Sequence, residues 1–373
     1  MKRIITLILV LTVFSLTISA QKKIPYLLKK IAAHYDSAAV KNIDRNYIEA
    51  PSRPWQFMLK GNVNQSSLKM RARGDVLGRE YVSTPKLTTE PAQYVGVWAG
   101  YRGHGVGYSV NVAGDKGSYL TFGSTGSSYG FNLRIHSFKN NHPHFGIKSD
   151  NVSEDNSNSS DKIQLNDPIH VRTIIVDGYY LFNGRRFSYA APYNYSVVQK
   201  RSAGSLMIGA MAYYGHINYA THNNADLIYM MHGLGRVKLY QGSLGMGYAY
   251  NWVPTKGLLV NVMVMPTVTL VNKIKAYGYG TNLDELIHDP RFMEDDESSE
   301  EWYESSKRIS FMAKKSFNSG LALNVDARLS VVYNFSRYFI GAYGQFNTFR
   351  YKHNDSRGRL NDWYVNATFG LRL

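Results

Sequence analysis

The sequence predicts an all-β protein, an antiparallel transmembrane β-barrel of about twelve strands. Two observations lead to this prediction: strands that alternate apolar and polar residues, and connections whose lengths alternate along the chain. The final stretch, 360–373, shows the alternation most clearly. One face carries its apolar side chains, which are Trp363, Val365, Ala367, Phe369, Leu371 and Leu373. Period-two alternation is typical of a strand with two different faces, and a membrane barrel presents its apolar face to lipid.

Eleven similar stretches precede the last one, separated by turn-forming residues. The predicted strands are 55–71, 92–102, 104–113, 117–124, 128–138, 168–182, 203–219, 234–252, 257–271, 318–335, 337–351 and 360–373. An even number of strands places both ends of the barrel chain on the same side of the membrane, as in single-chain bacterial barrels.

The connections between these strands sort by parity. The odd-numbered connections are mostly long and cover 72–91, 114–116, 139–167, 220–233, 272–317 and 352–359. The even-numbered ones are short, except 183–202, which we expect to be a periplasmic flap or a hidden hairpin. Bacterial outer-membrane barrels have short periplasmic turns and long outer loops. A Tyr-rich soluble β-protein is the alternative, but it has no reason to sort its connections in this way.

Composition agrees with a barrel and excludes other classes. The chain has 373 residues, a formal charge of +16, 29 Tyr, 32 Gly and no Cys. Tyr and Trp are typical of the aromatic girdles of membrane barrels. Without Cys there is no disulfide, thiolate metal site, lipid-anchored Cys or Cys nucleophile. The mean hydropathy of −0.30 excludes a bundle of membrane helices.

The N-terminal region predicts export. Residues 1–20 have a basic start and an apolar run, which is typical of a secretory signal peptide. Residues 21–54 are predicted to form a periplasmic arm with a short, basic amphipathic helix, because apolar residues recur at helical spacing over 24–35. The barrel itself is predicted to span 55–373.

Two of the long connections have a biased composition. Residues 149–161 are rich in Ser, Asn and Asp and predict a solvated loop. Residues 284–304 contain ten acidic residues and one Arg, although the rest of the chain is strongly basic. We expect this acidic segment either to fold over a basic barrel mouth or to remain a solvated surface loop.

Several stretches carry a family resemblance. They are NYIEAPSRPW at 46–55, GYRGHGVGYSVNV at 100–112, FNGRRFSYAAPY at 182–193 and QKRSAGSLMIGAMAYY at 199–214. Together they resemble an uncharacterised outer-membrane barrel family, the domain-of-unknown-function family 4421, over most of the predicted mature chain. The resemblance implies the barrel architecture and no activity, and it carries over no catalytic residue.

The polar faces of the strands predict the lining of the lumen. The residues expected there are Lys60, Asn62, Arg134, His136, Arg172, Arg236, Lys238, Asn324, Asp326, Arg328 and Arg372. Rings of Arg and Lys favour anions where a pore is open. The alternative is an inner wall sealed by paired side chains. On the outer face, Phe369, Leu371 and Leu373 are expected to form the signal read by the assembly machinery.

Catalytic and metal-binding patterns are weak. His104, Ser109 and Asn111 lie close in sequence, as do His216 and Asn218, but no complete nucleophile, base and orienting residue is apparent. The loop histidines His142 and His144 lack further ligands. We therefore expect no enzyme activity, no metal site and no cofactor.

Three functions remain open at this point. The first is a narrow passive channel whose basic lumen favours anionic or sugar-like solutes. The second is a closed structural or interaction barrel whose outer loops or periplasmic arm bind a partner, and the third is an outer-membrane hydrolase. The expected location is the outer membrane of a Gram-negative bacterium. The expected partners are membrane lipid, lipopolysaccharide, the assembly machinery and a periplasmic protein on the arm, but no nucleic acid.

Overall fold

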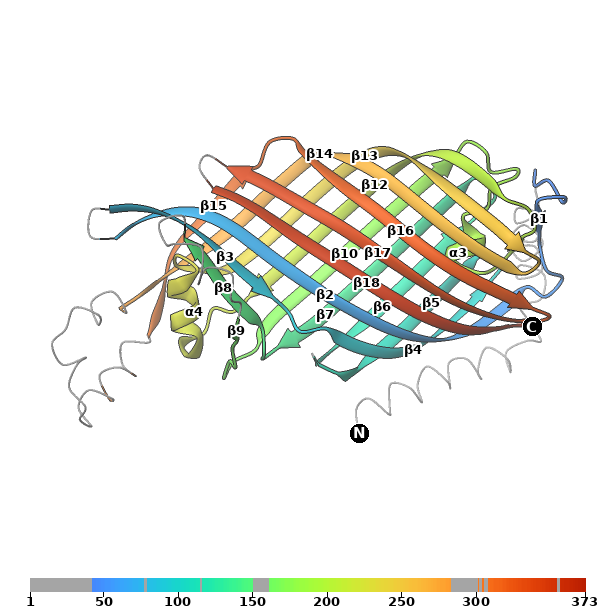
Figure 1. Cartoon of the computed structure of the whole chain (residues 1–373). Coiled ribbons are helices and arrows are strands. Elements are labelled where there is room, and N and C mark those ends of the chain that lie inside the picture. The colour runs from blue at the N-terminus through green and yellow to red at the C-terminus, as the bar shows by residue number, and fades with distance from the viewer. Residues whose placement is uncertain are drawn as a thin grey trace, which may run out of the picture.

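Twelve antiparallel strands close into a barrel (Figure 1). The computed structural model describes residues 42–76, 79–114, 116–149, 161–282, 301, 304, 308–353 and 356–373. Closure comes from the last strand, which pairs with the first over sixteen registered positions from Arg372↔Gln56 to Arg357↔Arg71. The predicted fold class is therefore confirmed.

Each predicted strand is present. The barrel strands are β2 (Trp55–Val76), β4 (Ala92–Tyr101), β5 (His104–Ala113), β6 (Lys116–Thr125), β7 (Tyr129–Asn140), β10 (Ile169–Leu181), β12 (Ala203–Asn218), β13 (Leu234–Thr255), β14 (Leu258–Thr281), β16 (Ala322–Phe335), β17 (Tyr338–His353) and β18 (Ser356–Arg372). Neighbours in sequence are neighbours in the barrel, so every wall connection is a simple up-and-down one.

The outer surface of the barrel is apolar. Large aliphatic side chains on alternate positions are about half exposed, as a lipid-facing wall requires. Examples from strands all around the barrel are Leu59, Val97, Leu206, Leu244, Met246, Val262, Leu329, Val365 and Phe369. Their neighbours in sequence point inward and are largely buried, as Asn366 and Thr368 are on either side of Ala367.

The two ends of the barrel differ. At the short-turn end, tight connections such as Arg102–Gly103 and Lys256–Gly257 join the strands, and both glycines take positive φ values of 90° and 87°. At the long-loop end the chain continues beyond the barrel. Figure 1 shows β1 and α3 at the short-turn end with the C-terminus, and α4 at the opposite end.

The long connections contain more secondary structure than the sequence predicts. They hold β3 (Arg79–Thr88), β8 (His144–Ser149), β9 (Asp161–Lys162), the 3₁₀ turn η2 (His222–Asn224), α4 (Ala225–Met230) and β15 (Ile309–Asn318). β3 pairs with β2, and β15 pairs with the outer part of β14. The prediction of loops there was wrong because pairing satisfies the backbone polar groups of strands that outgrow the barrel. The Ser-rich stretch 150–160 and most of 284–304 lie outside the described residues.

The short-turn end carries a small additional structure. β1 (Ile48–Glu49) pairs with β11 (Val198–Gln199) as a separate two-stranded sheet, and α3 (Ala190–Tyr193) lies beside it. The predicted signal peptide and arm helix lie outside the described residues. Among the residues that are described, none of the helices has the length and apolarity to cross a bilayer.

The outward position of Phe369 gives a first prediction. Its side chain is 49% exposed on the apolar face of β18. Phe369→Asp should place a charge against lipid at a cost that depends on depth and lies below the roughly 2–4 kcal/mol of Arg or Lys at the bilayer midplane. We expect much less folded barrel in the membrane, measured as heat-modifiable migration on gels. Lys256→Asp, in an exposed turn, is the control. Equal folded yields for the two variants would contradict the outward placement of Phe369.

Candidate functional site: a plug in the barrel

Residues 183–202, between β10 and β12, fold back into the lumen as a plug. This connection carries the aromatic and small residues of the run FSYAAPYNY. Phe187 and Tyr189 are 0% exposed and Tyr195 is 1% exposed, so the segment is more deeply buried than most of the wall. It is neither the surface flap nor the hairpin that the sequence predicts. Its apolar side chains need the interior of the barrel for burial.

Polar side chains of the wall hold the backbone of the plug. Four of its carbonyl oxygens accept hydrogen bonds from residues on four different barrel strands. These bonds are Asn251 Nδ2 to Ser188 O at 2.8 Å, Ser330 Oγ to Pro192 O at 2.8 Å, Gln56 Nε2 to Asn194 O at 3.2 Å, and Arg372 Nη2 to Tyr195 O at 2.8 Å. A buried backbone carbonyl without a donor is costly, so these side chains fix where the segment lies.

The wall also makes room for the plug rings. A Cβ atom at Gly130 would lie 2.4 Å from the ring of Tyr189, and one at Gly341 would lie 2.8 Å from the ring of Tyr195. Both distances are too short for ordinary contacts. Glycine at these two wall positions therefore permits the close packing of the plug aromatics.

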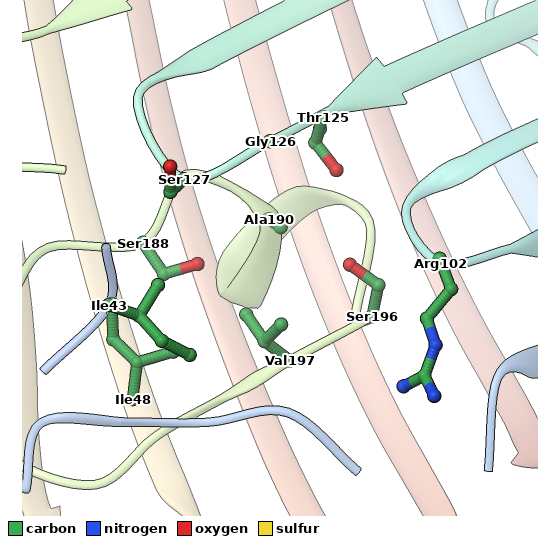
Figure 2. A pocket seen from close by; sticks show the side chains of 10 residues that line it. All are labelled: Ile43, Ile48, Arg102, Thr125, Gly126, Ser127, Ser188, Ala190, Ser196 and Val197. Carbon is green, nitrogen blue, oxygen red and sulfur yellow. The ribbon is translucent and has the colours of Figure 1, made fainter. Parts of the chain in front are cut away.

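The N-terminal arm holds the plug in place at the short-turn end of the barrel. Besides the β1–β11 pairing, Asp44 N donates to Arg185 O at 2.8 Å, and Arg186 Nε lies 3.4 Å from Asp44 Oδ2. The backbone N–H of Asn46 and the Arg186 guanidinium hold the pKa of the Asp44 carboxyl below its usual value. Figure 2 shows Ile43 and Ile48 of the arm beside Val197 of the plug.

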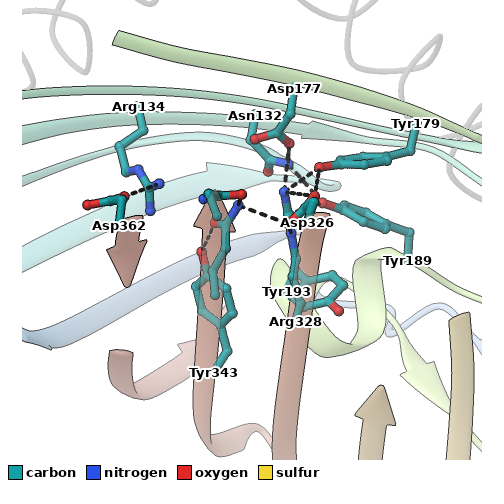
Figure 3. A network of polar contacts seen from close by, with 12 residues as sticks. Asn132, Arg134, Asp177, Tyr179, Tyr189, Tyr193, Asp326, Arg328, Tyr343 and Asp362 are labelled. Carbon is teal, nitrogen blue, oxygen red and sulfur yellow. Dashed lines mark hydrogen bonds and ion pairs between the residues drawn. The ribbon is translucent and has the colours of Figure 1, made fainter. Parts of the chain in front are cut away.

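A network of charged and phenolic side chains lies above the plug (Figure 3). Arg328 Nη2 is 3.1 Å from Asp326 and 3.2 Å from Asp177, and it also donates to the Tyr179 hydroxyl. Its Nη1 donates to the hydroxyl of plug residue Tyr189 at 2.8 Å. The three charged residues are at most 5% exposed, so the network is largely shielded from bulk water.

A second ion pair lies beside this network. Arg134 Nη2 is 3.5 Å from Asp362 Oδ2, and the Arg134 guanidinium sits 5.0 Å above the ring of Tyr364. A small cavity separates the pair from the Arg328 network, with about 80 Å³ open to the centres of water molecules. Lys60 lines this cavity with its ammonium 5.4 Å from the Trp98 ring. Among the described residues Lys60 has no carboxylate within 4.0 Å.

The half of the lumen toward the long loops is closed by apolar side chains. This apolar cluster is built from inward positions of the wall, from α4 and from the residue that follows it, with Leu227, Ile228 and Met231 at 3% exposure or less. Wall members include Leu68, Phe138, Ile175, Met211, Ile217, Leu239, Ile274, Phe349 and Leu360. The described part of the lumen therefore has three layers: plug, polar network and apolar cluster.

Eight of the predicted lumen residues point into the barrel. Lys60, Arg134, Asp326 and Arg328 belong to the network and its cavity, and Arg372 binds the plug. Asn62 accepts from Tyr364 Oη at 2.9 Å, and His136 Nε2 lies 2.9 Å from Tyr94 Oη. Asn324 Nδ2 donates to Thr269 Oγ1 at 2.7 Å. These residues fill the lumen rather than line an open pore.

Arg172, Arg236 and Lys238 do not point inward, and this part of the prediction was wrong. They alternate with Val171, Val237 and Leu239, which are at most 7% exposed inside the barrel. The lumen is apolar at this height, so the apolar residues of these strands face inward and the basic residues face outward. The rule that apolar residues face lipid therefore gave the opposite face for the outer halves of β10 and β13.

The expected assembly face points outward. Phe369 and Leu373 are 49% and 50% exposed, and Leu371 shares their face of β18. Whether machinery reads this face stays a prediction.

The candidate catalytic histidines are separated from their expected partners. His104 Nδ1 contacts Ser124 Oγ at 2.9 Å, whereas Ser109 Oγ accepts from Asn62 inside the barrel. His142 lies 4.0 Å from Glu90. Within the described parts of the chain no cluster of three or more side chains is arranged to hold a metal ion.

The sequence did not predict several residues of the Arg328 network and of the plug. Asp177, Tyr179 and Tyr189 complete the Arg328 network, and Gln199 joins Ser188, Arg186 and Asn251. The run AAPYNY was the available signal, because five apolar or aromatic residues in six have no reason to lie in a solvated turn.

The family model described as a domain of unknown function, number 4421, matches residues 42–372. The match covers the arm, the plug and the barrel together. No curated protein matches the sequence.

Solved structures similar to this chain are barrels of low sequence identity. The β domain of the Bordetella autotransporter BrkA has 11% identity and a TM-score of 0.30, covering 86% of this chain and 100% of its own. The Pseudomonas aeruginosa outer-membrane protein OprG has 10% identity and a TM-score of 0.28, covering 86% and 97%. The transport unit of the Escherichia coli autotransporter AIDA-I has 9% identity and a TM-score of 0.29, covering 92% and 96%. Similarity at this level transfers no activity.

The buried network gives a second prediction. Arg328→Gln would leave Asp326 and Asp177 buried without their shared cation. Breaking a buried ion pair in this way costs about 3–5 kcal/mol. We expect a drop of that size in the free energy of unfolding, measured by denaturant titration in detergent micelles. Arg337→Gln, at an exposed turn, should change it by less than about 0.5 kcal/mol. Similar changes in both variants would show that the network is not a structural centre.

Proposed function

The chain belongs to the family defined by the domain of unknown function 4421, and we propose that it is a closed outer-membrane β-barrel that binds a periplasmic partner. The observation that carries this proposal is the filled lumen. Plug, network and apolar cluster leave the inward side chains of β13, β14 and β16 almost without contact to water. A solute therefore has no ready path along the barrel axis.

The outer surface supports a membrane location. The apolar band of the wall is bordered at the short-turn end by aromatic side chains, including Trp55, Trp252, Tyr333 and Phe335. Aromatic residues at the edge of an apolar band are typical of the membrane interface. Short turns on one side and long extensions on the other favour placing the short-turn end in the periplasm.

The periplasmic end offers a structured and charged surface. Arm and plug together present exposed cations on the same side of the barrel, and only Asp44 and Glu49 oppose them within the described arm and plug. The cations are Arg45, Arg53, Arg185, Arg186, Lys200 and Arg201. Such a surface favours a partner with an acidic face, because complementary charge steers encounter and sets orientation.

A channel is the second candidate, and the cavity beside Lys60 favours it. Among the described residues the Lys60 ammonium has no carboxylate within 4.0 Å, although Asp177 also lines the cavity, and it would bind an anion there. For this cavity to conduct, both the plug and the apolar cluster would have to move. We therefore rank the channel below the closed barrel.

Conductance separates the two candidates. In planar bilayers the folded protein should give no defined conductance steps. A variant with 187–197 replaced by a Gly-Ser linker and with Leu227, Ile228 and Met231 changed to Ser removes both closures. It should conduct, which shows that the assay reports an open barrel. Defined, anion-selective steps from the unaltered protein would overturn the closed barrel in favour of the channel.

Photo-crosslinking tests the partner. A photoreactive amino acid at position 45 or 53, on the basic end face, should capture one discrete periplasmic protein in intact cells. The same amino acid at position 59 faces lipid and serves as the control. We expect the captured protein to have an acidic surface and the yield to fall at high salt. Identical products from positions 45, 53 and 59 would remove the support for a partner at this end.

A further inference from the structure

The lipid-facing wall carries Lys, Arg and His side chains toward the long loops. We call this set the basic wall. Its members lie on outward positions of β7, β10, β12, β13, β14 and β15. They are Lys139, His170, Arg172, His216, Arg236, Lys238, Lys275 and Lys314. Three of them, Arg172, Arg236 and Lys238, are residues that the sequence predicts to line the lumen.

Strand register places the basic wall in two rows. In the first, Arg172 pairs with His216, His216 with Lys238, and Lys238 with Lys275. Neighbouring strands are about 4.7–4.9 Å apart, so these four side chains form one continuous row. The second row lies two residues further out and contains Lys139, His170, Arg236 and Lys314. Like charges at such spacing repel one another unless an anion lies between them.

Within the described residues the rows have few acidic neighbours, and Asp167 interacts electrostatically with His170. The only acidic residue in the six strands is Asp177, which is buried inside the barrel. Among the described residues no carboxylate lies within 4.0 Å of a member of the basic wall. His216 Nε2 and Arg236 Nε are shielded from water and have no hydrogen-bond partner in the described structure.

Aromatic rings hold the cations at the edge of the apolar band. The Arg236 guanidinium lies 3.9 Å from the ring centre of Tyr277, and the Lys275 ammonium lies 5.4 Å from that of Tyr240. Tyr240 pairs with Tyr214 in the strand register, and their ring centres are 5.1 Å apart. These two tyrosines lie two residues closer to the membrane centre than the first row. Beyond these tyrosines the outward residues are apolar, as Val176 and Val271 are. The basic wall therefore lies at the height of lipid headgroups.

We propose that the basic wall binds the phosphate groups of the glycolipid in the outer leaflet, as lipopolysaccharide carries them. This inference rests on the proposed orientation, in which the long-loop end faces outward. Lys binds phosphate oxygens as a point charge, and Arg binds them through paired N–H donors. The acyl chains of the same lipid would lie along the apolar wall directly below. Only a lipid can contact both surfaces at once.

The chain itself contains a rival for this surface. The acidic segment 284–304 joins β14 to β15, the two strands that carry Lys275 and Lys314. Except for Glu301 and Glu304, it lies outside the described residues. If the segment occupied the basic wall, glycolipid binding would not depend on the cations there.

A charge-neutralising pair tests the proposal. Lys238→Gln combined with Lys275→Gln removes two registered neighbours from the first row. Lys256→Gln combined with Arg337→Gln removes the same charge from short turns at the opposite end. Each protein is purified from outer membranes in mild detergent, and glycolipid retained per barrel is measured as bound phosphate and hydroxylated fatty acid. We expect retention to fall at least fivefold in the first variant and to stay within twofold of the unaltered protein in the second.

Three added ligands identify the source of the phosphate. The stripped protein is titrated with lipopolysaccharide, with the same lipid after dephosphorylation, and with phosphatidylglycerol vesicles, and thermal unfolding is followed. Stabilisation by the phosphorylated glycolipid alone supports the proposal. Equal stabilisation by phosphatidylglycerol, or equal retention in the two variants, overturns it. These measurements do not involve conductance. Failure of the glycolipid proposal can therefore be told apart from failure of the closed-barrel proposal. Failure of the orientation itself would appear as absence from the outer-membrane fraction.

Discussion

The structure depends on hydrogen bonds from the barrel wall to the backbone of the plug. A segment with little regular secondary structure can enter the lumen only if its free carbonyl groups find donors there. Asn251, Ser330, Gln56 and Arg372 provide these donors from four separate strands. Plug residue Tyr189 in turn accepts from Arg328 and so connects the plug to the buried charges above it. The hydrogen bonds that position the plug therefore also keep the lumen closed.

The barrel was predictable because its wall obeys a local rule. In strands such as β18, successive residues alternate between lipid and interior, and this pattern is readable without any partner strand. Connection lengths then gave the direction of each strand. The extensions β3 and β15 were not predicted because most of their pairing partners lie beyond the ends of the predicted strands 55–71 and 257–271. A hairpin that extends beyond the barrel is predicted as a loop when each strand is expected only to be long enough to cross the membrane.

The candidate site was predictable only in part, for a physical reason. Reading polar residues as inward placed Asp326 and Arg328 correctly, because the inner half of the lumen is polar. The same rule failed for Arg172 and Lys238, because the other half of the lumen is apolar and the headgroup level outside it is charged. The alternation was real in both places, but the side that it faces depends on what fills the barrel at that height. No local pattern contains this information.

The central claim is that the plug is a fixed part of the folded barrel. Amide hydrogen exchange of the protein in lipid nanodiscs, followed by mass spectrometry, tests it most directly. Peptides covering 187–197 should exchange as slowly as those from the barrel strands, because their amides lie in a lumen closed to water. The exposed turn at 255–257 gives the fast reference. Exchange of 187–197 at the rate of that turn would show that the segment leaves the lumen, and it would contradict the closed barrel.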